Sequence, residues 1–462
     1  MTEDLFPEFD AASKSDWIAQ ASKEIKGRDV SATLSSKLWD TLVLKPFYTQ
    51  EDLSSPIVQQ RFHSPSETVG FPPRRWQNLV SVLPGDTNAQ ILNALENGAE
   101  GLVLHLNGFE DLSELLEGVL PQYISIFVLP KGNPVVALKT FLEWADATSA
   151  SADSISGGML WTPSDLSFDQ NESFGLGTEI LAELLEMSGP YPSFAPFCIK
   201  TSRYTESGGN PIEALGLGLG ELIELIDSMD IDPNVIFSKI FLEASVGENH
   251  FGEIVRLKAF RMAISQLASL YGVELKEEVV SLFCKTAQWS KSLLDPNTNL
   301  IRQTYEAMSA VLGGANWLWV QPLQEEVCSE MERRIARNVS SILREEAYLD
   351  KVMDPGAGAY FLENLKEEIL HNLKAQLSKI EALGGWSKAF QKGEIHASIR
   401  QQREKILNEV LQNQVTKIGA NKYPPPSTSS TEFVWEPFEE KLHELNPIRA
   451  TYLLELQILA ES

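Results

Sequence analysis

The residue types best suited to metal or acid–base chemistry are spread thinly along this chain. Six histidines occur, and no two stand three or four residues apart, the spacing at which a helix brings zinc ligands together. None neighbours one of the three cysteines, Cys198, Cys284 and Cys328, so we expect no metal-binding residue. His250, in GENHFGE after the sixth of eight apolar runs, is the best candidate for a chemical role, and a helix-cap or loop histidine is the plainer interpretation.

Motifs that bind phosphates or activate nucleophiles are missing from the sequence. The string GLGLGE (216–221) lies inside a helical pattern and not between a strand and a helix, so it predicts close helix packing. There is no GxSxG string and no Walker A string. Cys198 and Cys284 stand within apolar runs and are predicted to be buried. We therefore expect no catalytic and no cofactor-binding residue.

Eight short apolar runs alternate with helical patterns from about residue 76 onward. The runs are 79–84, 101–106, 124–130, 157–163, 194–204, 239–247, 279–287 and 316–322. Continuous apolar strands separated by helices are typical of a parallel sheet covered by helices. Eight such units, on the order of 250 residues, have the size of a (β/α)₈ barrel. An open doubly wound sheet gives the same alternation and remains the alternative.

Polar residues that follow these runs are predicted to meet at one end of the barrel, where barrel enzymes carry their active sites. They are Gly85, Asp86, Asn107, Lys131, Thr162, Ser202, Arg203, Tyr204, Glu248, Asn249, Lys285, Gln288 and Gln321. No recognisable acid–base pair is among them. Arg203 is a permanent cation and cannot serve as a general acid near neutral pH.

The overall charge excludes several classes of protein. The 462 residues include 38 Lys and Arg against 64 Asp and Glu, a net charge of 38 − 64 = −26. Such an excess disfavours nucleic acid and anionic membranes as partners. The acidic N-terminus has no signal-peptide pattern, and no apolar run approaches the ~18 residues of a membrane span. With three cysteines and no CxxC pair, we expect a reduced, cytoplasmic protein.

The pattern divides the chain into three parts. Residues 1–75 form an N-terminal extension, with a short helix near residues 17–25 and an irregular, Pro-rich stretch over 45–75. The extension has too little apolar surface to fold alone, so it must lie on its own domain or on a partner. Residues 76–420 form the barrel and its trailing helices, and 421–462 form a Pro/Ser linker and an apolar tail.

Several blocks of the sequence resemble the methylmalonyl-CoA mutase family. They are KIFLEASVGENHFGEIVRLKAFRM (239–262), KTAQWSKSLLDPNTNLIRQTYEAMSAVLGG (285–314), IARNVSSILREEAYLDKVMDPGAGAYFLENL (335–365) and PFYTQEDL (46–53). Their order and spacing fit the family over most of the chain. The resemblance implies a (β/α)₈ barrel, in agreement with the strand count.

The departures from the family pattern concern its catalytic equipment. Active members carry a cobalamin domain with a DxHxxG string; none occurs here, and the chain is expected to be too short for that domain. In TSRYTESGG (201–209), Arg203 stands where the family has a substrate-contacting histidine. In RRWQNLVSVLP (74–84), Ser81 stands where the family has a tyrosine, and TAQW (286–289) replaces TSGW.

The resemblance with these losses implies the non-catalytic small subunit of a heterodimeric methylmalonyl-CoA mutase. Its partner would be the large catalytic subunit, which would hold adenosylcobalamin and interconvert methylmalonyl-CoA and succinyl-CoA. This chain is expected to bind no cofactor and no CoA ester, and its N-terminal extension to reach the partner. Two alternatives remain: an active acyl-CoA mutase barrel that uses a separate cobalamin subunit, and a stand-alone acyl-CoA-binding regulatory module.

Bulky strand residues fit the idea of a silent barrel. Active barrels of the family thread the pantetheine arm of CoA along the axis, which requires small lining residues. Here the strands carry Phe197, Phe241, Phe283, Trp317 and Trp319, which would fill the axis if they point inward. Ordinary barrels are also filled by large apolar side chains, and an open axial channel would refute the hypothesis.

Overall fold

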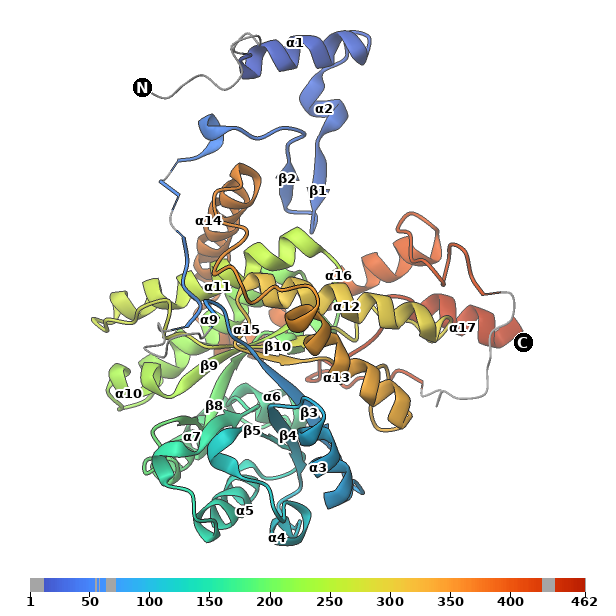
Figure 1. Cartoon of the computed structure of the whole chain (residues 1–462). Coiled ribbons are helices and arrows are strands. Elements are labelled where there is room, and N and C mark those ends of the chain that lie inside the picture. Colours follow the sequence, from blue (N-terminus) through green and yellow to red (C-terminus); the bar gives the residue numbers. More distant parts are fainter. Residues whose placement is uncertain (1–11, 55, 58, 64–71, 426–436, 462) are drawn as a thin grey trace.

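A ring of parallel strands forms the centre of the molecule in the computed structural model, which describes residues 12–54, 56–57, 59–63, 72–425 and 437–461 (Figure 1). The strands are β3 (Gln77–Val82), β4 (Gly101–Leu106), β5 (Ser125–Pro130), β6 (Ser156–Met159), β7 (Phe194–Ala195), β8 (Phe197–Lys200), β9 (Ile240–Val246), β10 (Leu282–Thr286) and β11 (Trp317–Trp319). Each of the eight predicted runs overlaps one strand, except the fifth, which contains the two short strands β7 and β8.

The ring is closed by hydrogen bonds between its first and last strands. Strand β3 pairs in parallel with β11 as well as with β4. Strands β7 and β8 are two parts of one strand position, separated at Pro196, where β7 pairs with β6 and β8 pairs with β9. The amide of Cys198 also donates to the carbonyl of Trp161 at 3.0 Å. The expected (β/α)₈ barrel is thereby confirmed, and the open sheet is excluded.

Helices cover the outside of the ring. The barrel helices are α3 (Asn88–Glu96), α4 (Leu112–Leu115), α5 (Pro134–Ala147), α6 (Ser164–Gln170), α7 (Phe174–Met187), α8 (Ser202–Glu206), α9 (Pro211–Ser228), α10 (Pro233–Ser238), α11 (His250–Leu270), α12 (Pro296–Gly313) and α13 (Glu330–Glu345). They are followed by α14 (Tyr360–Leu383), α15 (Trp386–Gln391), α16 (Glu394–Leu411) and α17 (Tyr452–Glu461). No helix within the described ranges is long and apolar enough to cross a membrane.

The glycines of GLGLGE lie within α9, where Gly216 and Gly220 allow α14 to pack closely and Gly218 faces Thr201 and Ile199. A Cβ atom on Gly216 would stand 2.8 Å from the Cβ of Gln376, and one on Gly220 would stand 3.1 Å from Ile380. Larger residues would force the two helices apart. The string therefore serves helix packing, as its position within a helical pattern predicts.

The N-terminal extension folds into an arm that stands above the barrel in Figure 1. The arm contains α1 (Lys14–Glu24), α2 (Val30–Leu34) and a hairpin of β1 (Ser36–Leu38) with β2 (Leu42–Leu44). Ser13 caps α1, since its hydroxyl accepts the amide of Asp16. The sequence predicted the helix but not the hairpin, whose strands are too short to show an alternating pattern. Part of the irregular stretch at 45–75 lies outside the described residues.

Candidate functional site at the barrel mouth

Aromatic rings fill the axis of the barrel. The ring of Phe127 lies 4.8 Å from that of Phe283, 5.0 Å from Trp317 and 5.4 Å from Phe241, measured between centroids. These rings form one cluster with Trp319 and with smaller apolar residues of the other strands. Because neighbouring strand residues face opposite sides, this cluster and the layer beneath the helices are separate. Four of the five bulky residues named from the sequence therefore face the axis.

Phe197 is the exception among those five. It belongs to the outer core between strands and helices, whereas its neighbour Cys198 belongs to the inner cluster. The alternation along a strand permits only one of two adjacent residues to face the axis. The sequence missed Phe127, which lies in the third run and occupies the centre of the cluster.

The two indoles of β11 are anchored by hydrogen bonds inside the barrel. Trp317 Nε1 donates to Gln77 Oε1 at 2.9 Å, and Trp319 Nε1 donates to Ser81 Oγ at 2.9 Å. The Ser81 hydroxyl donates in turn to the buried Glu325 carboxyl, whose pKa is raised by burial. Ser81 is the position at which the resembled family has a tyrosine, and the small side chain leaves room for the Trp319 indole.

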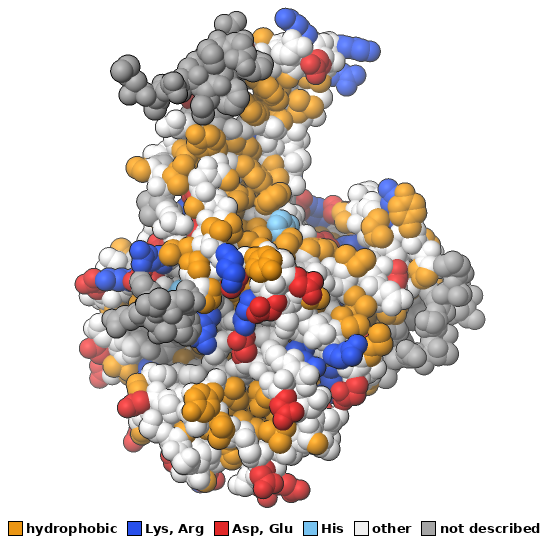
Figure 2. Space-filling view, viewed as in Figure 1, with side chains coloured by type: hydrophobic (Ala, Val, Ile, Leu, Met, Phe, Trp, Pro, Cys, Tyr) orange, Lys and Arg blue, Asp and Glu red, His pale blue; other side chains and the backbone are white. Residues whose placement is uncertain are grey.

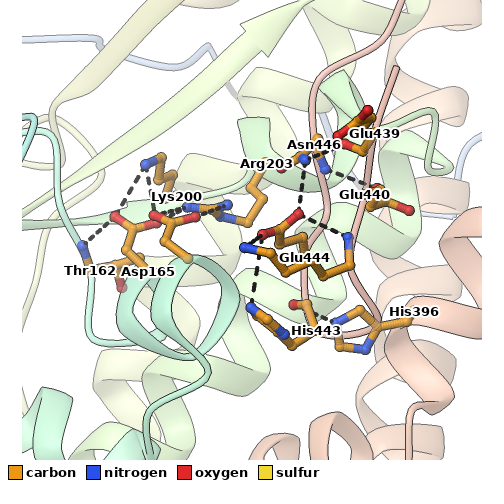
Figure 3. A network of polar contacts seen from close by, with 12 residues as sticks. Thr162, Asp165, Lys200, Arg203, His396, Glu439, Glu440, His443, Glu444 and Asn446 are labelled. Atoms are coloured by element: carbon orange, nitrogen blue, oxygen red, sulfur yellow. Dashed lines mark hydrogen bonds and ion pairs between the residues drawn. The ribbon is translucent and has the colours of Figure 1, made fainter. Parts of the chain in front are cut away.

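The cations at the carboxyl ends of β8 and β10 each have a carboxylate partner within the chain. Asp165 lies 3.1 Å from Lys200 Nζ and 2.7 Å from the Arg203 guanidinium, and both cations turn toward it in Figure 3. Lys285 Nζ lies 3.4 Å from Glu243. Burial alone would raise the pKa of Asp165, but Lys200 and Arg203 outweigh burial and hold it below its ordinary value. These cations are therefore committed to internal ion pairs.

Further contacts within the chain hold the Arg203 side chain in place. Its guanidinium also bonds Asp169 at 2.8 Å and lies 5.0 Å from the centre of the Phe168 ring. Burial opposes its charge, but Asp165 and Asp169 together raise its pKa above the ordinary value. It therefore neither donates a proton nor offers an unpaired charge at the place of the family's histidine.

A C-terminal segment crosses the mouth of the barrel. The amide of Ile448 donates to the Glu206 carbonyl and that of Ala450 donates to the Trp289 carbonyl, both at 2.9 Å. Glu206 lies in α8, directly beyond β8, and Trp289 lies beyond β10. The segment is followed by α17, where the carboxylate of the buried Glu455 accepts a hydrogen bond from the Leu293 amide at 3.0 Å. The chain's own residues thus occupy part of the mouth.

The structure gathers many of the predicted mouth residues but not all of them. Those bonded within the mouth are Thr162, Ser202, Arg203, Lys285, Gln288 and Gln321.

The other predicted residues bond elsewhere or are exposed. Glu248 pairs with Lys417, beyond α16, at 2.5 Å. Asp86 pairs with Arg333 of α13 at 2.8 Å, and Tyr204 turns into the helical layer to accept Trp386 Nε1 at 3.1 Å. Gly85 is a turn with φ of 95°, and Asn107, Lys131 and Asn249 are exposed.

His396 bonds the His443 carbonyl at 2.9 Å, but the residues that the structure describes contain no cluster of His, Cys, Asp or Glu able to hold a metal. His250 begins α11 and its Nδ1 bonds the Ser309 hydroxyl at 2.7 Å. His105 lies in β4 with its ring 6.0 Å from Trp319, and burial lowers its pKa to about 3. His105 is therefore neutral at neutral pH.

Carboxylates that organise the mouth were not predicted from the sequence. Asp165 and Glu206 stand in short helices after their strands, where nothing in the pattern distinguishes them from surface acids. Glu243 carried a usable signal, because it interrupts a buried apolar strand two residues from Phe241 and Ser245. A charge at that position requires a partner inside the barrel, and Lys285 supplies it.

Glu221 of α9, which lies near this mouth, makes the stability of the folded chain depend on pH. Burial, with the nearby Asp165 charge adding to it, raises the Glu221 pKa from 4.5 to about 7, although Thr162 and Ser164 donate to it. The unfolded chain loses this proton near pH 4.5, so the native state loses stability as pH rises from there to about 7. Glu221→Gln should therefore gain on the order of 3 kcal/mol relative to the native chain between pH 5 and pH 8.

Urea denaturation at both pH values measures this effect, and Glu143→Gln at an exposed position is the control. An equal difference between Glu221→Gln and the native chain at pH 5 and pH 8 would contradict the assignment.

Comparison with known proteins places this barrel in a class of coenzyme A mutases. The sequence profile of the methylmalonyl-CoA mutase family matches residues 86–450, most of the chain, and the chain belongs to that family. Among its relatives is the methylmalonyl-CoA mutase small subunit of Porphyromonas gingivalis, 24% identical over 442 residues, which covers 91% of this chain and 71% of the relative. The small subunit of Streptomyces virginiae is 25% identical over 439 residues, covering 87% and 69%.

The large subunit from Porphyromonas gingivalis is also similar, with 26% identity over 254 residues, 54% of this chain and 36% of that relative. The profile and these names support the small-subunit branch of the family that the sequence blocks indicate.

Proposed function

We propose that this chain is the non-catalytic small subunit of a heterodimeric, adenosylcobalamin-dependent methylmalonyl-CoA mutase, in which the large subunit performs the isomerisation. The filled barrel axis is the observation that carries the proposal. The Phe127 ring lies 4.8 Å from that of Phe283 and 5.0 Å from that of Trp317, between centroids, at the centre of the barrel. A pantetheine arm along this axis would have to displace them, so we expect no CoA ester to bind here.

A second observation supports a cofactor site outside this chain. The family's cobalt-ligating histidine lies in the DxHxxG string of its cobalamin domain, and this sequence contains no such string. Among the described histidines, the His250 and His396 rings bond within the chain, to the Ser309 hydroxyl and to the His443 carbonyl. His105 lies buried within the barrel. The radical chemistry of this family belongs to the cofactor, so a barrel without a place for it would be silent. We therefore assign the cofactor to the large subunit.

The N-terminal arm supports the assignment of a protein partner. Helix α1 has no buried residue, although Trp17, Ile18 and Ile25 lie on it or at its end. Ile18 and Val43 expose 44% and 50% of their surface, and Figure 2 shows hydrophobic side chains gathered over the arm. An apolar face that the described residues cover only in part, as Phe47 does where it stacks on Trp17, is typical of an interface. The existence of both a small and a large subunit in Porphyromonas gingivalis supports a large subunit as that partner.

Co-expression with the large subunit of the same organism tests the proposal. Size-exclusion chromatography with light scattering should give a 1:1 complex, and two separate peaks would count against the heterodimer. The purified chain, with adenosylcobalamin and methylmalonyl-CoA, should give no succinyl-CoA, alone or with an isolated cobalamin domain. Turnover in either mixture would favour the active-barrel alternative, and calorimetric binding of CoA esters would favour the regulatory module.

A further inference from the structure

The turn of the β1–β2 hairpin adopts a backbone conformation that its residues disfavour. Trp39 and Asp40 have φ values of 50° and 61°, in the left-handed region where glycine is normally required. Two consecutive non-glycine residues remain there only when surrounding contacts hold them. Contacts from outside the turn must therefore hold its backbone in this conformation.

Polar contacts from two helices of the body hold this turn. Asn210, which caps α9, donates from Nδ2 to the Trp39 carbonyl at 2.6 Å. Lys405 of α16 lies 2.6 Å from the Asp40 carboxylate, and Gln402 Nε2 donates to the same carboxylate at 3.1 Å. Each of these contacts joins the arm to the body, and within the turn Thr41 Oγ1 also donates to the Trp39 carbonyl at 3.2 Å.

Shape complementarity adds a third contact at the start of α11. The Trp39 indole rests on Gly252, where an added Cβ atom would stand 2.9 Å from the ring and 3.0 Å from the Leu38 side chain. Leu38 itself is buried. The hairpin tip thus fits a site on the body that only glycine leaves open.

A second attachment lies on α14, away from the hairpin tip. The Tyr48 ring is 5.2 Å from that of Phe361, and Asn364 Nδ2 donates to the Asp52 carbonyl at 2.8 Å. Asp52 also pairs with Lys14 of α1 at 2.6 Å. Two separate attachments define an orientation, whereas a single one would allow the arm to pivot.

We propose that this two-point clamp holds the arm as a preorganised docking surface for the large subunit. This inference rests on the proposed function, and it adds that contacts with the body fix the orientation of the interface. A surface already fixed in its bound orientation loses less conformational freedom on association, so the complex forms more tightly. The Trp39–Asp40 turn serves as the positioning element of this surface.

Two variants loosen the clamp without touching the exposed apolar face. Gly252→Val inserts a side chain beneath Trp39, and Lys405→Met removes the cationic partner of Asp40 while keeping an apolar stem. In the full chain alone, hydrogen exchange of the amides of residues 36–44 should become at least tenfold faster in both. Lys139→Met, which removes the exposed pair of Lys139 with Glu143 at 3.8 Å, should leave exchange unchanged.

The same variants should bind the large subunit about tenfold more weakly, and Lys139→Met should bind like the native chain. Unchanged exchange in both clamp variants would overturn the clamp, and faster exchange with unchanged affinity would overturn its role in docking. If the native chain itself forms no complex, the proposed function fails, while the exchange measured on the chain alone still decides whether the clamp exists.

Discussion

Ile18→Glu should raise the dissociation constant for the large subunit about 100-fold or more. Ile18 exposes 44% of its surface on α1, a helix without buried residues, so the chain should fold as before. In the complex, the new carboxylate would be desolvated against an apolar surface. Losing one buried aliphatic side chain costs about 2 kcal/mol, and burying an unpaired charge costs more. Surface plasmon resonance or calorimetry with the purified large subunit measures the affinity.

A matched control separates the arm from the rest of the surface. Leu270, the last residue of α11, exposes 84% of its surface on the body, and Leu270→Glu introduces the same charge there. This variant should bind like the native chain. Equal weakening by both substitutions, or none by Ile18→Glu, would contradict the assignment of the arm as the interface.

Phe127→Ala should cost about 3 to 5 kcal/mol of unfolding free energy, the range for removing a fully buried aromatic side chain. The ring is fully buried and contacts Phe241, Phe283 and Trp317 at the centre of the barrel. Strands on all sides are joined in a closed ring, so the walls collapse little into the space that the ring leaves. Urea denaturation followed by circular dichroism measures the loss.

Phe127→Leu refines this prediction, because it keeps most of the volume and should cost less than about 1.5 kcal/mol. A cost below 1 kcal/mol for Phe127→Ala would mean that the axis is loosely packed, and the main support for a silent barrel would disappear. The Phe127→Ala variant should still give no turnover with methylmalonyl-CoA, since the mouth keeps its internal ion pairs.

Most of the architecture followed from the sequence, and the errors have physical causes. Strand β4 begins and ends as its apolar run does, whereas β10 begins at Leu282, three residues into the run at 279–287. Apolar content marks burial, and strand ends are set by pairing with neighbours, here Leu282 with Leu242 of β9. The β1–β2 hairpin escaped prediction because its two strands have three residues each.

The candidate site was less predictable than the fold. Residues at the ends of the runs were expected to lie together, and Arg203, Lys285 and Thr162 do lie at the barrel mouth. Their partners Asp165, Glu243 and Glu221 were not foreseen. An acidic chain offers many carboxylates, and spacing does not single out Asp165 or Glu221, although the interruption of a buried strand by Glu243 was a usable signal. Arg203 and Asp165 lie 38 residues apart.

The sequence by itself predicted the eight-unit barrel and the family, and the resemblance implies that Arg203 and Ser81 replace the family's histidine and tyrosine. Those features reside in local pattern and residue identity, which need no knowledge of distant contacts. Only the tertiary structure decided that the axis is filled by Phe127 and its neighbours, that the mouth cations are paired, and that the Trp39–Asp40 turn holds the arm. Each of these depends on which face of a strand points inward and on contacts between residues far apart in the chain, and both are settled when the ring of strands closes.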